Sequence, residues 1–175
     1  MISQPIFLVG PMGAGKSTIG KLLAAQLGLP FADSDKVLEE RTGADIPWIF
    51  DVEGEAGFRR REHEVLRDLC TGCAQVIATG GGIVLLPENR RLLMEHGLVV
   101  YLRADLEQLV ERTSKNSNRP LLRVADPRAK LAEILAQREA FYCEVADMVC
   151  DTDDCTPRQA AQLVVDRLQQ DAAAC

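Results

Sequence analysis

The stretch Gly10-Pro11-Met12-Gly13-Ala14-Gly15-Lys16-Ser17 decides how the rest of the sequence is interpreted. It fits the pattern G-x-x-x-x-G-K-[ST], in which glycines let the main chain curl so that successive N–H groups point at the oxygens of a polyphosphate. In this pattern Lys16 reaches the β and γ phosphates of a nucleotide, and the Ser17 hydroxyl ligates Mg²⁺. The alternative is a glycine-rich turn that fits the pattern by chance.

The residues on either side of the motif favour phosphate binding. The apolar run from Pro5 to Val9 predicts a short buried strand directly before it. Apolar residues recur at helical spacing after Lys16, until Gly28 and Pro30 stop the predicted helix. A strand, a glycine loop and a helix in this order is the context that the motif requires.

The rest of the chain continues to alternate predicted strands and helices, which indicates a parallel sheet covered by helices on both faces, with ligands at the carboxyl ends of the strands. We therefore expect an α/β fold in one domain, residues 1–175: a three-layer P-loop fold whose central parallel sheet has about five strands. The predicted strands are 31–32, 75–78, 98–102 and 148–150, and the predicted helices are 87–96 (capped by Gly97), 105–112, 126–145 and one starting at Thr156 and Pro157. The charged segment 35–70, interrupted at Gly43 and Pro47, is expected to pack as helices beside the sheet.

Composition limits the classes of function. The formal net charge of -6 argues against general affinity for nucleic acid backbones, which requires a basic face. The N-terminal apolar run is too short for a secretory core or a membrane span, so we expect a cytoplasmic protein that binds no membrane. In that compartment the six cysteines are expected to be reduced. Cys70 and Cys73 form a single C-x-x-C, which by itself is a weak indication of a metal or redox site.

Two further polar or glycine-rich clusters follow predicted strands. The residues Asp33-Ser34-Asp35 can face a phosphate site from the end of a neighbouring strand, or they can simply cap a helix. The run Gly80-Gly81-Gly82 can contact a substrate closely or form an ordinary turn. The polar stretch 113–119 lacks apolar periodicity and predicts a loop.

Taken together, the motifs resemble the shikimate kinase family. They are GPMGAGKST, DSD at 33–35, GFRRRE at 57–62, TGGG at 79–82 and RPLL at 119–122, in the family's order and nearly end to end. The resemblance implies a nucleoside-monophosphate-kinase-like fold with a P-loop at 10–18, a shikimate-binding subdomain near 34–61 and a lid near 112–124. It also implies transfer of the γ-phosphoryl group of ATP to shikimate, a step towards chorismate and the aromatic amino acids.

The resemblance also assigns roles by position. It implies that Asp35 holds and activates the attacked hydroxyl, that Arg59 and Arg138 clamp the carboxylate, that Gly81 offers a backbone N–H, and that Glu62 supports Arg59. The alternative for Glu62 is an ordinary ion pair on a helix surface. The implied catalytic residues are Lys16, Asp35 and Arg119; the nucleotide-binding residues are Gly13, Ala14, Gly15, Lys16, Ser17, Thr18 and Arg119; the shikimate-binding residues are Asp35, Arg59, Gly81 and Arg138; one Mg²⁺ per subunit is held by Ser17 and, through water, by Asp33.

The chain departs from the family near 151–156, where the family often places a residue against adenine. Cys155 takes that position here, and Arg158 lies a few residues further on, so the adenine contact stays open between them.

Three other functions are weighed against this one. A kinase for gluconate or a nucleoside monophosphate would share the P-loop but lack the set of acceptor-site arginines and glycines. A regulatory or chaperone module without catalysis would not need Asp35, Arg59, Arg119 and Arg138 together. A nucleic-acid-dependent NTPase conflicts with the acidic balance. The expected partners are ATP and shikimate alone, with a monomer as the expected state.

Overall fold

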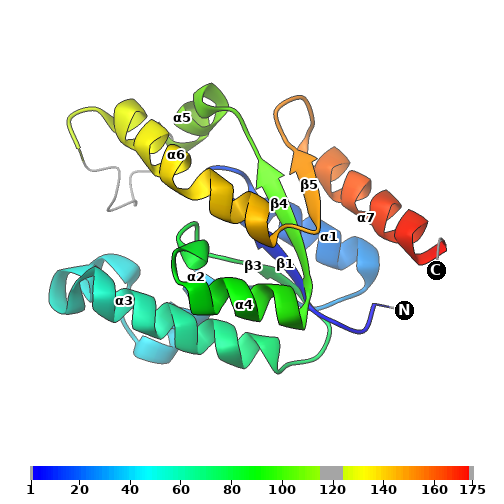
Figure 1. Ribbon diagram of the computed structural model, residues 1–175, viewed down its shortest axis with the longest axis horizontal. Helices are drawn as coiled ribbons and strands as arrows, with labels where there is room; N and C mark the ends of the chain where they lie inside the picture. The colour runs from blue at the N-terminus through cyan, green and yellow to red at the C-terminus, as the bar shows by residue number, and fades with distance from the viewer. Residues whose placement is uncertain (1, 115–123, 174–175) are drawn as a thin grey trace.

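The computed structural model describes residues 2–114 and 124–173, and for 171–173 the backbone only. Its centre is an all-parallel sheet in the order β2-β3-β1-β4-β5 (Figure 1). The first strand therefore lies in the middle of the sheet, with its backbone bonded on both sides. The strands are β1 (Ile6–Val9), β2 (Phe31–Asp33), β3 (Val76–Ala78), β4 (Leu98–Arg103) and β5 (Met148–Asp151).

Helices cover both faces of the sheet, which confirms the predicted three-layer α/β fold. α1 and α7 pack together on one face, and α3, α4 and α6 supply the buried residues of the other. The helices are α1 (Lys16–Leu27), α2 (Ser34–Thr42), α3 (Ile46–Cys70), α4 (Pro87–His96), α5 (Leu106–Ser114), α6 (Pro127–Val145) and α7 (Pro157–Ala173), with a 3₁₀ turn, η1 (Ile83–Leu85). In the part of the chain that the structure describes, no helix is long and apolar enough to cross a membrane.

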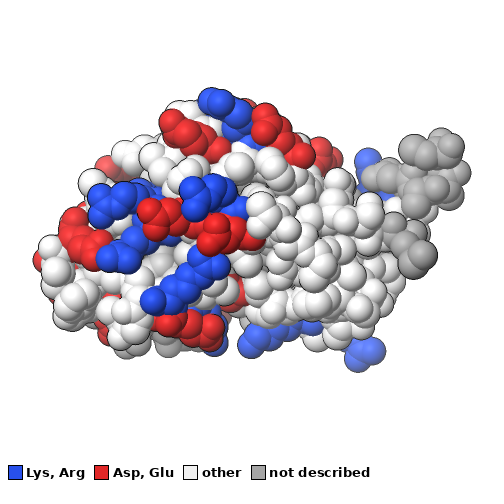
Figure 2. Space-filling model, turned by 90° about the horizontal axis from the view of Figure 1, so that it is seen from below, with Lys and Arg blue, Asp and Glu red and all other residues white. Residues whose placement is uncertain are grey.

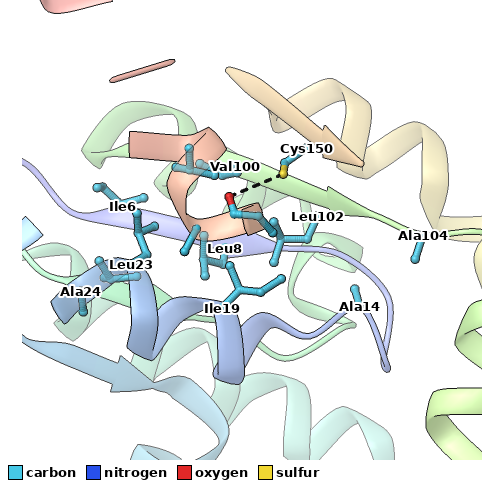
Figure 3. Packing of buried hydrophobic residues seen from close by; sticks show 14 of the residues in the cluster. Ile6, Leu8, Ala14, Ile19, Leu23, Ala24, Val100, Leu102, Ala104 and Cys150 are labelled. Atoms are coloured by element: carbon cyan, nitrogen blue, oxygen red, sulfur yellow. Dashed lines mark hydrogen bonds between the residues drawn. The ribbon is translucent and has the colours of Figure 1, made fainter. Parts of the chain in front are cut away.

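The larger cluster of buried apolar residues lies between the sheet and the α1–α7 layer (Figure 3). Ile6 and Leu8 of β1 meet Ile19 and Leu23 of α1, all of them almost fully buried. The residues of β1 that alternate with these, such as Phe7, point into a second apolar cluster on the opposite face of the sheet. Since both faces of β1 are buried, its sequence is apolar throughout, and this explains why the run was recognisable.

A third, separate cluster packs α2 against α3 and consists of Leu38, Ile49, Phe58 and Val65. In Figure 1, α3 extends beyond the sheet on the side away from α7. The helix contains one break that the sequence analysis missed, at Gly54, whose φ of 69° lies in the left-handed region. Pro47, expected as an interruption, instead occupies the first turn of α3, where its missing N–H has no helical partner to lose.

The surface seen from below intermixes acidic and basic side chains over one half and is largely uncharged over the other (Figure 2). The exposed side chains of α2 and α3 form ion pairs, such as Arg41–Asp68 at 2.7 Å. Pairs of this kind contribute only about 0–1 kcal/mol each. The stability of the fold therefore depends on the three apolar clusters.

A glycine is needed at position 97 because a side chain would not fit there. The end of α4 does not itself need the glycine cap that the sequence predicts. Gly97 does follow the last residue of α4, but its φ of -171° is ordinary extended backbone. A Cβ at this position would lie 2.5 Å from the Pro5 carbonyl oxygen and 2.6 Å from the Phe7 ring. The absence of a side chain lets the start of β4 approach β1.

We expect Gly97→Ala to lower the free energy of unfolding by about 1–3 kcal/mol, because the added methyl group meets backbone that cannot rotate away. Urea denaturation followed by circular dichroism measures the change. Gly72→Ala is the matched control, since a Cβ there meets chiefly the flexible end of Gln75. Equal stability of the two variants would contradict the close-approach explanation.

Candidate active site

The motif at 10–17 forms a loop between β1 and α1, with left-handed backbone at Gly13 and Gly15 (φ 86° and 91°). Only glycine, which has no Cβ, adopts these conformations without a steric penalty. The loop leads into the N-terminus of α1, where unpaired N–H groups and the helix dipole favour an anion. The Lys16 ammonium lies inside this loop and donates to the carbonyls of Gly10 and Pro11, both at 2.8 Å.

A cavity of about 570 Å³ opens above this loop, at the carboxyl ends of the strands where the fold class predicts a ligand. All six predicted nucleotide-binding residues from 13 to 18 line it, together with Asp33, Asp35 and Gly81. The structure thus brings three predicted groups to one space: the phosphate loop, the metal-side carboxylate and part of the acceptor site. The remaining lining residues are Met12, Ile19, Thr79, Arg112, Thr152, Cys155 and Pro157.

Asp33 combines both functions that its sequence context left open. One carboxylate oxygen caps α2 by accepting from the backbone N–H of Asp35 at 3.1 Å. The other accepts from the Ser17 hydroxyl at 2.6 Å and therefore faces the phosphate loop. A hydroxyl and a carboxylate beside a phosphate site are the hard oxygen ligands that Mg²⁺ prefers, so this donor set fits the ion.

Asp35 lines the cavity and is partly buried beside Glu62 and Asp33. Burial, followed by the charges of Glu62 and Asp33, raises the pKa of Asp35 to about 7. Lys16 acts in the opposite direction but does not offset these effects. A carboxyl group that titrates near neutral pH can serve as a general base at physiological pH.

Gly80 shows how closely the acidic side chains converge. A Cβ at Gly80 would lie 2.7 Å from an Asp35 oxygen and 2.9 Å from a Glu62 oxygen. Its backbone N–H donates to the hydroxyl of Ser34 at 3.1 Å, which connects the glycine run to the start of α2. The Gly80 carbonyl also accepts from the Ile83 N–H at 3.1 Å, so the run forms a turn that is closely packed against the two acidic side chains.

Arg59 and Glu62 form a buried ion pair one helical turn apart, at 2.8 Å. Arg59 is 8% exposed and Glu62 only 2%, so the alternative of a surface ion pair for Glu62 is wrong. Burial raises the pKa of Glu62 despite the opposing charge of Arg59. Among the described residues, the Nε of Arg59 and one oxygen of Glu62 have no hydrogen-bond partner. Buried polar atoms without a hydrogen-bond partner are costly, which points to a polar ligand that would complete the site.

Arg138 reaches the same region from α6. It is 6% exposed, its Nε also has no partner among the described residues, and Nη1 lies 3.8 Å from where a Cβ of Gly81 would be. Arg59 lies beside the next glycine, since its Cζ would be 2.6 Å from a Cβ at Gly82. The two predicted acceptor-site arginines thus flank the glycine run from α3 and α6.

The sequence analysis missed Arg112, at the end of α5. Its guanidinium donates to the Gly13 carbonyl at 3.4 Å and to the Thr152 carbonyl at 2.9 Å, which links the phosphate loop to the β5–α7 connection. Of the two candidates for the adenine contact, Cys155 lines the cavity and Arg158 does not. Pro157, the first residue of α7, lines it as well. Arg119 and most of the predicted lid lie outside the described residues.

Three comparisons with known proteins agree. A family model described as shikimate kinase matches residues 12–169. A shikimate kinase from Pseudomonas syringae pv. syringae (strain B728a) is 56% identical over 165 residues, covering 94% of this chain and 96% of that protein.

Solved structures give the same answer. A shikimate kinase from Acinetobacter baumannii in complex with shikimate superposes with a TM-score of 0.94 at 46% identity, covering 96% of this chain and 94% of that one. A shikimate kinase from Aquifex aeolicus vf5 superposes with a TM-score of 0.80 at 35% identity, covering 96% and 98%. With its P-loop, its flanking carboxylates and a match over nearly its whole length, this chain belongs to the shikimate kinase family.

Proposed function

We propose that this protein transfers the γ-phosphoryl group of ATP to the 3-hydroxyl of shikimate, giving shikimate 3-phosphate and ADP, in the synthesis of chorismate and the aromatic amino acids. The observation that carries the proposal is the convergence of Asp35, Arg59 and Arg138 on the glycine run beside the phosphate cavity. A small hydroxylated carboxylate complements such a set. The bound shikimate of the Acinetobacter baumannii relative supports the same acceptor.

On the nucleotide side, residues 13–18 would surround the phosphates with backbone N–H groups and the Lys16 charge. Ser17 and, through water, Asp33 would hold one Mg²⁺, which supplies charge neutralisation on the phosphate oxygens when bound. Lys16 would exchange its bonds to the Gly10 and Pro11 carbonyls for phosphate oxygens. These contacts position the phosphoryl group and stabilise developing charge, which provides most of the acceleration in this chemistry.

On the acceptor side, Asp35 would accept the proton of the attacking hydroxyl. Its raised pKa makes it a better base than an ordinary aspartate, while leaving a large fraction ionised at neutral pH. Arg59 and Arg138 would bind the shikimate carboxylate, because a guanidinium presents a planar pair of donors to a carboxylate. Glu62 holds Arg59 by the buried ion pair and so fixes the direction of that clamp.

For adenine, we propose a position between Arg112 and Pro157, with Cys155 nearby, because these residues line the cavity beyond the phosphate loop. A planar guanidinium stacks well on an aromatic ring. Arg119 is proposed, from the family resemblance alone, to neutralise the transferred phosphoryl group from a lid at 112–124.

The proposal also covers the domain organisation, the oligomeric state, the location and the partners of the protein. The separate apolar cluster of α2 and α3 supports a shikimate-binding subdomain at about 34–61 within a single domain. We propose a monomer in the cytoplasm, with ATP and shikimate as its partners.

The proposal predicts that ADP release from Mg-ATP is stimulated strongly by shikimate and not by quinate or gluconate. A coupled pyruvate kinase and lactate dehydrogenase assay on the purified protein measures this. Binding of ATP without stimulation by any of the three acids would favour the regulatory alternative, and stimulation by gluconate would favour a different acceptor.

For Asp35 we expect kcat/KM for shikimate to rise with pH through about 7, because only the ionised carboxylate can take the proton. Asp35→Asn should retain ATP affinity and lose phosphoryl transfer by a factor on the order of 10²–10⁴. Glu95→Gln, an exposed carboxylate on α4, is the control and should resemble the wild type. An active Asp35→Asn protein would remove the base from the mechanism.

The same carboxyl group should make stability depend on pH. Its pKa is about 7 in the folded protein and near 3.8 when unfolded, so the folded state binds more protons between these values. The stability contributed by the neutral form is fully present below 3.8 and is lost as the pH rises to about 7. Urea denaturation at a series of pH values should therefore show Asp35→Asn gaining on the wild type as the pH rises through this window. A constant difference between the two proteins would contradict the raised pKa.

A further inference from the structure

We infer that Tyr142 is a positioning residue of the acceptor site: its phenol fixes the Gly81 peptide beside the Arg138 guanidinium and so increases affinity for shikimate without touching it. The inference rests on the proposed function, since it takes Gly81 and Arg138 as shikimate-binding groups. Tyr142 lies on α6, one helical turn after Arg138, and is fully buried.

The first observation is the bond between Tyr142 and the glycine run. The Tyr142 hydroxyl donates to the Gly81 carbonyl oxygen at 2.5 Å, across 61 residues of sequence. Glycine has little intrinsic preference for one backbone conformation, so contacts must impose the conformation of Gly81. The two neighbouring peptides are held by other bonds: the Gly80 N–H donates to Ser34, and the Gly80 carbonyl accepts from the Ile83 N–H at 3.1 Å. Tyr142 holds the third.

The second observation is that the same phenol lies beside Arg138. The Nη1 of Arg138 lies 3.8 Å from where a Cβ of Gly81 would be, and the charge of this guanidinium lowers the pKa of the Tyr142 hydroxyl. Burial outweighs this effect and raises that pKa to about 12, so the phenol stays protonated and can donate to Gly81 at physiological pH. One hydroxyl therefore fixes the carbonyl side of Gly81, whose N–H is assigned to the acceptor, beside the Arg138 guanidinium.

The third observation is that the Tyr142 ring itself is held in place. It stacks on Tyr101 of β4 with ring centroids 5.1 Å apart, and both rings are fully buried. The Tyr101 hydroxyl, in contrast, has no hydrogen-bond partner among the described residues. The pair thus contains two buried phenols in one stack, of which only one is bonded to the site.

This difference supplies a matched experiment, with Tyr142→Phe and Tyr101→Phe each removing one oxygen from the same stacked pair. We expect Tyr142→Phe to raise the KM for shikimate, and the Kd for shikimate measured by calorimetry without nucleotide, by about three- to tenfold. The KM for ATP should stay unchanged, because the phosphate loop does not depend on this bond. Tyr101→Phe should leave both KM values unchanged, because it removes a hydroxyl that bonds nothing in the site.

Thermal denaturation of both variants separates positioning from stability. A lower Tm of Tyr142→Phe with an unchanged shikimate KM would overturn the inference, as would an equal rise in the KM for ATP. An equal rise in shikimate KM for Tyr101→Phe would assign the effect to ring packing and would overturn it too. Failure of the proposed function is recognised from the wild type alone, which would then neither bind nor phosphorylate shikimate.

Discussion

Arg59 and Glu62 form an ion pair with almost no access to water, and the proposed acceptor site is built around this pair. A buried ion pair recovers its desolvation penalty only when its remaining donors and acceptors are also satisfied. Here some are not: nitrogen atoms of two arginines and an oxygen of Glu62 are left without protein partners in the described part of the chain. In the proposed function this energetic cost falls where a charged acceptor would offset it, so the unliganded fold would set part of the binding free energy for that acceptor.

The parallel sheet is what brings these groups to the phosphate loop. β1 ends at Val9 and β2 at Asp33, on either side of β3, so the loop, the metal-side carboxylate and the glycine run emerge at one edge. The Ser17–Asp33 bond joins the start of α1, just after the phosphate loop, to the end of β2. Helices α3 and α6 contribute Arg59 and Arg138, which lie beside the glycine run. The order of the strands in the sheet differs from their order along the chain. The crossover connections therefore bring residues that are distant in sequence close together at the site.

Most of the fold could be predicted from the sequence, because fully buried parallel strands are apolar runs and the helices carry clear start and stop signals. The phosphate loop could be predicted for the same reason: its chemistry requires glycines at fixed spacing. The acceptor residues came from a family resemblance, since an arginine such as Arg138 in the middle of a helix carries no local signal of burial. Arg112 and Tyr142 were missed because their importance arises from contacts with Gly13 and Gly81, distant in sequence. The role predicted for Gly97, a helix cap, was wrong because the close approach of two strands cannot be recognised from the local sequence.

The glycine run has a consequence for how the family can change during evolution. The volume that side chains at Gly80 and Gly82 would fill is taken by Asp35, Glu62 and Arg59. A substitution at either glycine therefore acts on the charged residues before it acts on the backbone. Substitution of these glycines therefore depends on the residues of α2 and α3 that pack against them. An alanine at Gly80 would fit only after the neighbouring acidic side chains had shifted or had been replaced by shorter ones. A lineage that replaced Asp35 or Arg59 by a smaller residue would, by the same packing, release the constraint that keeps these positions glycine.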